Sequence, residues 1–298
     1  MPAADDRERA RRRQGAIFLA VVVLAWGLTW PVNKAILASV PPLWMAAIRS
    51  ALATVALFAI VAATGRLALP PRGDVPIVLG ISLLHMVAFV VLTNIGLQIV
   101  PTGRSVVLAY TTPLWVAPGA AVFLREPLTP RRLLGVASGL AGLVLLFNPL
   151  AFDWSDRDAV LGNGAILAAA VMWAASIVHI RGHRWRSTPF ALAPWEALVA
   201  TAALVPVALA SGPPPPIDWD GRLVALMLYS AGPGTAVAYW AMAMASRDLP
   251  AVATSLGLLA TPVVSIVVAT LWLGETVTLP LAAAVVLILG GVALGATR

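Results

Sequence analysis

The sequence predicts an all-α integral membrane protein in which ten transmembrane helices form two inverted five-helix repeats. Composition is the first reason: 60% of the 298 residues are hydrophobic and 11% are charged, a balance that water-soluble proteins of this size do not have. The second is that the chain divides into continuous apolar runs of roughly 20 residues, enough for a helix to cross about 30 Å of hydrocarbon. The third is an internal repeat. Transmembrane β-strands are excluded, because they would be shorter and alternating.

The apolar runs set the predicted helices and their boundaries. Residues 1–14 form a basic cytoplasmic tail, and the run that follows is longer than the apolar core of a cleaved signal peptide, so we expect it to be retained. The first repeat covers residues 15–150, an external linker covers 151–161, and the second repeat covers 162–298. The predicted helices are 15–37, 43–64, 75–97, 104–124, 132–149, 161–180, 190–211, 222–245, 250–273 and 278–296.

Positive charges indicate the orientation of the helices. If the N-terminus is cytoplasmic, 15 of the 20 Lys and Arg residues fall in cytoplasmic segments, as the positive-inside rule requires. We therefore expect a multi-pass protein of the bacterial inner (plasma) membrane, with both termini in the cytoplasm. The arginines are spread over short loops, so the net charge of +7 does not indicate a nucleic-acid partner.

Sliding the sequence along itself reveals the repeat. When the sequence is aligned with itself after a shift of 147 or 149 residues, identical or chemically related residues match in the same order. Because each copy has five helices, an odd number, the second copy must enter the membrane from the opposite side, and secondary transporters with this plan bind substrate between the two halves. The aligned pairs include Trp26 with Trp173, Lys34 with Arg181, Arg49 with Glu196, Thr112 with Thr261, and Glu126 with Glu275.

Three segments carry a resemblance to a known family. They read WGLTWPVNKAILASVPPLWMAAIRS, YTTPLWVAPGAAVFLREPLTPRRLLGVASGLAGLVLL and LATPVVSIVVATLWLGETVTLPLAAAVVLILGGVAL. The chain resembles the EamA-type transporters of the drug/metabolite transporter superfamily in the order of these segments, in their spacing and in their recurrence in both halves. The resemblance extends from Ala16 to Leu294. The resemblance implies ten helices, cytoplasmic termini and export of amino acids, metabolites or drugs, and it leaves the substrate open.

Lys34, the only lysine, lies near the end of the first predicted helix. Its repeat partner Arg181 begins a cytoplasmic loop, so Lys34 is expected at the outer membrane boundary, where its stem can follow apolar surface and its ammonium can reach headgroups or water. Alternatively, Pro31 removes a helix hydrogen bond and turns Asn33 and Lys34 toward an external vestibule, where a cation would suit a substrate carboxylate. Both interpretations stay open.

Arg49 and Glu196 lie about six residues inside their predicted helices, where an unpaired charge costs at least a few kcal/mol. The inverted repeat sets Arg49 toward the outside and Glu196 toward the inside. We therefore expect each to brace its own half or line a gate, and we do not expect the two to pair. Glu196 is the only deep acid that could couple transport to protons, so proton coupling and facilitated diffusion both stay open.

His85 is the only histidine deep inside a predicted helix. Its titration range suits a proton carrier, although a histidine bonded to a neighbouring helix is the simpler interpretation. The chain has three histidines, no cysteine and scattered carboxylates, so we expect no metal site and no cofactor.

Aromatic residues within the predicted helices indicate a central cavity. All three tyrosines fall in mid-span, away from the interfaces where tyrosines usually anchor. Such a cavity suits apolar or aromatic small molecules with a few polar contacts, although each ring taken singly could equally face lipid. The predicted substrate-binding residues are Trp26, Trp30, Asn33, Lys34, His85, Tyr110, Trp115, Trp173, Tyr239 and Trp240.

Small residues predict close packing of the fifth and tenth helices. Gly135 and Gly139 are four residues apart, as are Gly291 and Gly295, a spacing that lets helix backbones approach closely. The same glycines could equally form the face of a homodimer.

These features favour a small-molecule exporter in the lipid bilayer, for aromatic or other hydrophobic amino acids, that works by alternating access. A drug, a cation or another metabolite is the alternative on the same fold. A membrane-embedded enzyme would need an acid/base or nucleophile set, and the sequence has no Ser-His-Asp order, HExxH motif or paired intramembrane carboxylates, so we expect no enzymatic activity. A scaffold subunit would leave the polar residues inside the helices without a role.

Overall fold

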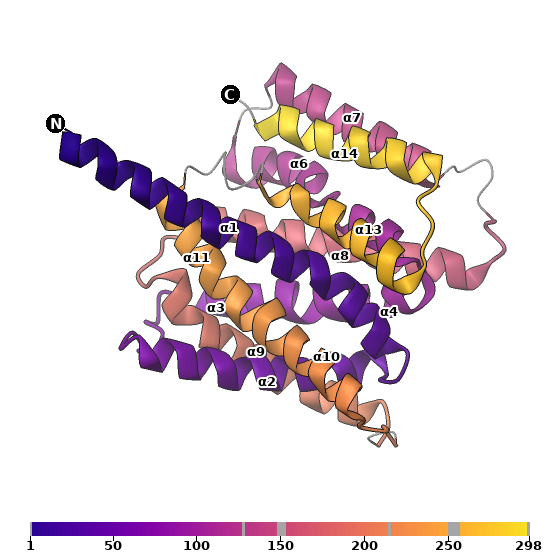
Figure 1. Ribbon diagram of the computed structural model, residues 1–298, viewed down its shortest axis with the longest axis horizontal. Helices are drawn as coiled ribbons and strands as arrows, with labels where there is room; N and C mark the ends of the chain where they lie inside the picture. The colour runs from indigo at the N-terminus through magenta and orange to yellow at the C-terminus, as the bar shows by residue number, and fades with distance from the viewer. Residues whose placement is uncertain (1, 127–128, 148–152, 214–215, 250–256, 297–298) are drawn as a thin grey trace.

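The computed structural model describes residues 2–126, 129–147, 153–213, 216–249 and 257–296. Within these ranges the chain is a bundle of helices joined by short turns, without strands (Figure 1). Six stretches are long and apolar enough to cross a membrane, and two further apolar helices, Ala260–Leu273 and Leu279–Gly295, are shorter. The six are Arg9–Leu37, Pro42–Ala63, Val75–Ile99, Thr102–Leu124, Arg157–Gly182 and Pro189–Ala210.

The first half of the chain contains α1 to α7. The third predicted helix is one continuous stretch whose middle, η1, is π-helical. The fourth is broken into α5 and α6. The bounds are α1 Pro2–Leu37, α2 Pro42–Ala63, α3 Val75–Gly80, η1 Ile81–Phe89, α4 Val90–Ile99, α5 Thr102–Ala109, α6 Thr112–Leu124 and α7 Pro130–Phe147.

The second half repeats the π-helical feature. A π-helical segment, η2, lies between α10 and α11. Residues 250–256, which begin the ninth predicted helix, and residues 151–152 of the predicted linker lie outside the described ranges. The bounds are α8 Arg157–Gly182, α9 Pro189–Ala210, α10 Gly221–Ala231, η2 Gly232–Val237, α11 Ala238–Asp248, α13 Ala260–Leu273 and α14 Leu279–Ala296.

Two boundaries differ from the prediction for clear reasons. Helix α1 begins at Pro2 and not at residue 15, because the basic segment before the apolar run continues the helix beyond the length a membrane needs. The fourth predicted helix breaks at Tyr110 and Thr111, since Pro113 has no backbone N–H to continue α5 but fits the first turn of α6.

Helix ends in the two halves correspond closely. Helices α6 and α13 both end in a residue with left-handed backbone geometry, Arg125 with φ 56° and Gly274 with φ 70°, and these residues are 149 positions apart. Glycine adopts that geometry without strain, whereas arginine does not. The left-handed turn is therefore a property of the repeat, and only the second copy has the residue best suited to it.

Contacts between helices also relate the two halves. Helix α2 packs on α9 and α7 packs on α14, so two elements lie beside the elements that the sequence repeat aligns with them. Helix α1 packs on α11 and α13, and its counterpart α8 packs on η1, α4 and α6. This exchange of partners is the one expected of two halves related by a pseudo-two-fold axis.

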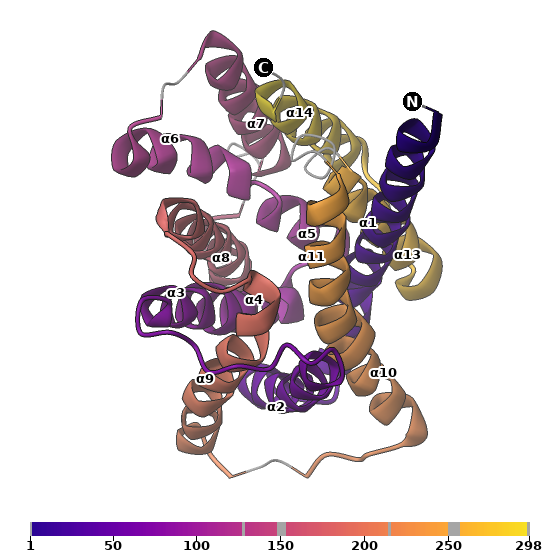
Figure 2. The ribbon, with the colours of Figure 1, turned by 90° about the vertical axis from the view of Figure 1, so that its left-hand side faces the viewer.

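The contact between α7 and α14 depends on glycine. In Figures 1 and 2 the two helices lie side by side at one edge of the bundle. A Cβ atom added at Gly135 would lie 2.5 Å from the Gly291 carbonyl oxygen, and one at Gly291 would lie 2.5 Å from that of Gly135. The predicted close approach is confirmed, and it occurs within one chain.

Much of the outer surface is apolar. Phe123, Leu271 and Leu279 are 77%, 82% and 83% exposed, and many other large apolar side chains are also exposed. Surfaces of this kind suit hydrocarbon and not water.

Candidate functional site

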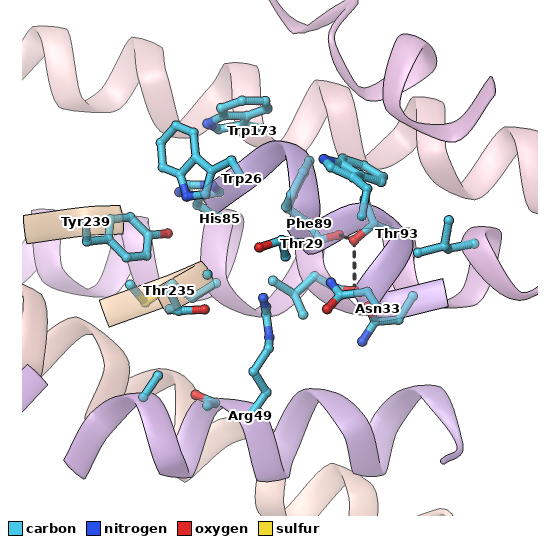
Figure 3. A pocket seen from close by; sticks show the side chains of 18 of the residues that line it. Trp26, Thr29, Asn33, Arg49, His85, Phe89, Thr93, Trp173, Thr235 and Tyr239 are labelled. Atoms are coloured by element: carbon cyan, nitrogen blue, oxygen red, sulfur yellow. Dashed lines mark hydrogen bonds between the residues drawn. The ribbon is translucent and has the colours of Figure 1, made fainter. Parts of the chain in front are cut away.

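A cavity of about 120 Å³ lies between the two halves of the bundle, with side chains that converge on it from several helices (Figure 3). It has room for several water molecules. Its walls come mainly from α1, α2, η1, α4, α8 and the segment around η2. The lining residues are Trp26, Thr29, Trp30, Asn33, Arg49, Ser50, Ala53, His85, Met86, Phe89, Val90, Thr93, Asn94, Leu97, Tyr110, Trp173, Ala197, Gly234, Thr235 and Tyr239.

The two π-helical segments border this cavity. Segment η1 contributes His85 and Phe89, while η2 contributes Gly234 and Thr235. A shift of 149 residues aligns η2 with residues 83–88, inside η1. A Cβ atom at Gly234 would lie 2.5 Å from Thr29 Oγ1, so only glycine allows α1 to approach here. Short π-helical insertions are frequent at functional sites.

Aromatic rings form one wall of the cavity. His85 and Trp173 are stacked, with ring centroids 5.4 Å apart and planes inclined by 7°. Phe89 and Tyr110 contact the same indole at centroid distances of 5.2 Å and 5.9 Å. We call His85, Phe89, Tyr110 and Trp173 the aromatic wall, and it offers flat apolar surface to a ring-bearing ligand.

Most polar side chains of the cavity are already hydrogen-bonded. Thr29 Oγ1 donates to the Ala25 carbonyl at 2.7 Å, and Ser230 Oγ donates to Asn33 Oδ1 at 2.8 Å. Arg49 extends from α2 into the cavity between Asn33 and Thr235. It makes no hydrogen bond or ion pair with any residue in the described ranges.

The structure brings seven of the ten predicted substrate-binding residues to this cavity. The other three lie elsewhere: Lys34 bonds to the end of α4, Trp115 lines a second cavity, and Trp240 packs edge-on against Phe18 at 5.2 Å. The seven are Trp26, Trp30, Asn33, His85, Tyr110, Trp173 and Tyr239.

The two intramembrane charges lie in different surroundings. Arg49 lines the cavity, whereas Glu196 on α9 is 5% exposed and its Oε1 has no hydrogen-bond partner among the described residues. No ion pair joins them there, so the expectation that each acts in its own half stays a prediction.

Several lining residues were not predicted, although a helical pattern in the sequence points to them. Thr29 lies between Trp26 and Asn33 at a spacing of three and four residues, on one face of α1. Phe89 and Thr93 follow His85 at successive spacings of four. Residues at such spacings share a helix face, so the predicted members could have identified the others.

A second cavity of about 620 Å³ lies between α6 and α8. Trp115, Phe123 and Ala174 line it, as do His179 and His183 near the end of α8. The corresponding contact in the other half, α1 with α13, is tight: a Cβ atom at Gly27 would lie 2.6 Å from Val264 Cγ1.

The end of the bundle around Lys34, where α1 and α4 end and α5 begins, is held by bonds to the backbone. We call it the Lys34 end. Lys34 Nζ donates to the carbonyl oxygens of Leu97, Gln98 and Val100 at 2.5, 3.2 and 3.1 Å. The Glu275 carboxylate accepts from the backbone N–H groups of Thr102 and Gly103, which begin α5, at 2.7 and 2.9 Å. These charges complement the helix ends.

The opposite end, where α6 and α8 finish, is held by ion pairs between side chains. We call it the Gly182 end. Glu126 pairs with Arg181, and also with Arg132 at 3.2 Å. Glu126 and Arg181 are the repeat partners of Glu275 and Lys34. In the part of the chain that the structure describes, neither of these two side chains bonds to the backbone of a helix terminus.

The Gly182 end also contains a buried loop contact. Asp74, whose side chain is 0% exposed, accepts from His183 Nε2 at 3.0 Å and from the backbone N–H groups of Arg186 and Ser187. Burial alone would raise the pKa of Asp74, but these hydrogen bonds outweigh it and hold the pKa below its ordinary value. The loop after α2 is thus tied to the loop after α8.

The described residues contain no group of three or more His, Cys, Asp or Glu side chains that could hold a metal ion. The polar groups of the main cavity are a guanidinium, an imidazole, hydroxyls, amides and indole N–H groups, which suit recognition of an organic molecule.

Comparison with known proteins identifies relatives over most of the chain. The model of the EamA-like transporter family matches residues 13–148 and 160–297. "Uncharacterized transporter YvbV" of Bacillus subtilis (strain 168) is 26% identical over 95% of this chain and 92% of its own length. A "Riboflavin transporter" of Rhizobium johnstonii is 31% identical over 50% of this chain and 47% of its own. A solved crystal structure with 22% identity covers 95% of this chain and 97% of its own at a TM-score of 0.66, which shows the fold alone.

Proposed function

The chain belongs to the EamA-like transporter family, and from that premise we propose that it exports aromatic or other hydrophobic amino acids. It is a multi-pass membrane protein whose substrate is a small molecule. The observation that carries the proposal is the aromatic wall, because four rings on one side of a cavity favour a flat apolar group. The predicted site residues Trp26, Trp30, Asn33 and Tyr239 complete the proposed binding surface.

We further propose the ten-helix topology, with two inverted five-helix repeats, both termini cytoplasmic and the chain in a bacterial inner membrane. The distribution of arginines supports this orientation. The exchange of helix partners between the halves supports the inversion. In the naturally cysteine-free chain, a cysteine introduced at Ser155 should react with a reagent that acts only from outside.

The proposed mechanism is alternating access. Such a mechanism closes the site to one side at a time. An apolar cluster that includes Val32, Ile36, Met45 and Leu97 fills the Lys34 end, whereas the cavity between α6 and α8 extends to the Gly182 end. With the proposed orientation, the described state has its outer side shut, and the cavity between α6 and α8 lies toward the cytoplasmic side.

Counterflow in proteoliposomes tests this function. The solutes are labelled tryptophan, threonine and a cationic drug, and the variants are Trp173→Ala and Tyr239→Ala. A stacked ring contributes about 0.5–1.5 kcal/mol beyond area burial, so each variant should slow tryptophan exchange by roughly two- to tenfold. Trp240→Ala is the matched control, because Trp240 packs on Phe18 outside the cavity.

The possible outcomes separate the components of the proposal. If wild type exchanges none of the three solutes, the substrate assignment fails. If it exchanges tryptophan and both cavity variants match it, the aromatic wall is not the binding surface and the transport function stands.

Riboflavin is a second candidate substrate. The relative from Rhizobium johnstonii is named a riboflavin transporter. A flat ring system would also suit the aromatic wall. Labelled riboflavin therefore belongs in the same experiment, and exchange of riboflavin without tryptophan would replace the first candidate by the second.

A further inference from the structure

We propose that Arg49 binds the carboxylate of the substrate, so that the cavity selects organic acids with an apolar or aromatic group over the corresponding amines. This inference rests on the proposed function, because it assigns the charged part of the molecule whose ring lies on the aromatic wall.

The first argument is the isolation of the guanidinium. Arg49 offers five N–H donors, and none of them is bonded to a residue that the structure describes. Glu196 is the deep acid of the opposite half, and it forms no ion pair with Arg49 in that part of the chain. A cation inside a membrane protein usually has a partner or lines a watery cavity. Arg49 lines a cavity, and an anion in that cavity would supply the partner.

The second argument is geometry. The guanidinium is a planar fork that can hold both oxygens of a carboxylate in parallel hydrogen bonds. Figure 3 shows the Arg49 side chain directed into the same space that His85 and Trp173 border. One molecule can therefore meet the cation with its acid group and the wall with its ring.

A neighbouring amide supports the same assignment. Asn33 Oδ1 already accepts from Ser230 Oγ at 2.8 Å, so the Nδ2 amide group is the one left to donate. Asn33 and Arg49 come from different helices and lie on the same side of the cavity in Figure 3. Two donor groups on one side of the cavity can hold the two oxygens of a carboxylate.

Four probes separate charge from ring: indole-3-propionate, tryptamine, hexanoate and hexylamine. Affinities are measured by isothermal titration calorimetry with the purified full chain in nanodiscs. Wild type should bind indole-3-propionate at least tenfold more tightly than tryptamine. Arg49→Met, which keeps the apolar stem, should lose that preference by at least tenfold. Arg49→Lys keeps the charge without the fork and should retain an intermediate preference.

Arg222→Met is the matched control, because Arg222 is exposed at the start of α10 and away from the cavity. It should bind all four probes as wild type does. If Arg49→Met does not fold, as judged by gel filtration, Arg49→Lys and Arg49→Gln take its place.

Equal affinity of wild type for indole-3-propionate and tryptamine would overturn the proposal. So would an unchanged acid preference in the folded Arg49 variants. If hexanoate bound in an Arg49-dependent manner and neither indole probe bound, the carboxylate site would stand and the aromatic substrate of the proposed function would fall. If no acid bound, the carboxylate site would fall, and binding of tryptamine would then leave the aromatic cavity standing.

Discussion

Charged residues at equivalent positions of the repeat lie at the Lys34 end and at the Gly182 end, but their side chains bond to different kinds of partner. At the Lys34 end, Lys34 and Glu275 each bind backbone atoms of helix termini. At the Gly182 end, their counterparts Arg181 and Glu126 pair with each other, and their side chains are 41% and 26% exposed. These repeat positions therefore fasten the Lys34 end to the backbone, whereas at the Gly182 end they form an ion pair in contact with solvent and the bonds to the backbone come from Asp74.

This difference indicates which end resists opening. Charge-assisted bonds to helix termini satisfy backbone groups that otherwise have no partner, so breaking them leaves several groups unsatisfied. Exposed ion pairs contribute only about 0.2–1 kcal/mol each, because water competes for both charges. The turn geometry agrees, since Gly274 is relaxed at the Lys34 end while Arg125 is strained at the Gly182 end. We infer that the described state, shut at the Lys34 end, is the more stable one.

The largest expected effect comes from removing the carboxylate that caps α5. Glu275→Ala leaves the N–H groups of Thr102 and Gly103 without an acceptor and should lower the free energy of unfolding by roughly 2–4 kcal/mol. Glu126→Ala breaks only exposed ion pairs and should cost less than about 1 kcal/mol. Both are measured by thermal unfolding of the purified protein, followed through its tryptophan fluorescence. Equal losses of unfolding free energy in Glu275→Ala and Glu126→Ala would contradict the inference that the Lys34 end is held more strongly than the Gly182 end.

A smaller effect is expected from adding one methyl group to each helix contact. In Gly27→Ala the new Cβ would lie 2.6 Å from Val264 Cγ1, so α1 and α13 must separate, at a cost of about 1–3 kcal/mol. In Gly119→Ala the nearest atom is Val178 Cγ2 at 3.1 Å, and a small shift relieves it.

The measurement for this pair is the distance between spin labels on α1 and α13, together with thermal stability. Gly164→Ala is the control, because a Cβ atom there meets nothing within 4 Å. If Gly27→Ala left both the distance and the stability at their wild-type values, this would contradict the conclusion that α1 and α13 pack more tightly than α6 and α8.

The smallest effect is expected at the two left-handed turns. Arg125→Gly removes the strain at φ 56° but gives the unfolded chain more freedom, so we expect a net gain of only about 0.5 kcal/mol. Gly274→Ala introduces strain at φ 70° and should cost about 1 kcal/mol. The shift in unfolding midpoint measures both changes. Opposite signs support the difference between the ends, and a loss in both variants would contradict it.

Hydropathy and repetition were sufficient to predict much of the fold. Apolar runs located the six long candidate spans, and glycine spacing located the close contact of α7 with α14. The π-helical segments could not be predicted, because the residues of η1 fit an α-helix equally well and only the packing around them selects the wider turn.

The site was predictable where residues at helical spacing share a face, and not where neighbours in sequence were grouped together. Successive helical residues differ by about 100° in direction. Asn33 and Tyr239 therefore line the cavity while Lys34 and Trp240, one residue further on, point elsewhere. The acceptors of Lys34 lie more than 60 residues along the chain, beyond the reach of any local pattern.

Lys34 carries the only side-chain amine of the protein. Acylating reagents attack a free amine, and here the nitrogen is held against three carbonyl oxygens. Separation of α1 from the end of α4 would release it. The extent of acylation at Lys34 Nζ after a short pulse of such a reagent, measured by peptide mass spectrometry, would then report how often this end opens. The unaltered chain therefore contains its own chemical reporter of that opening.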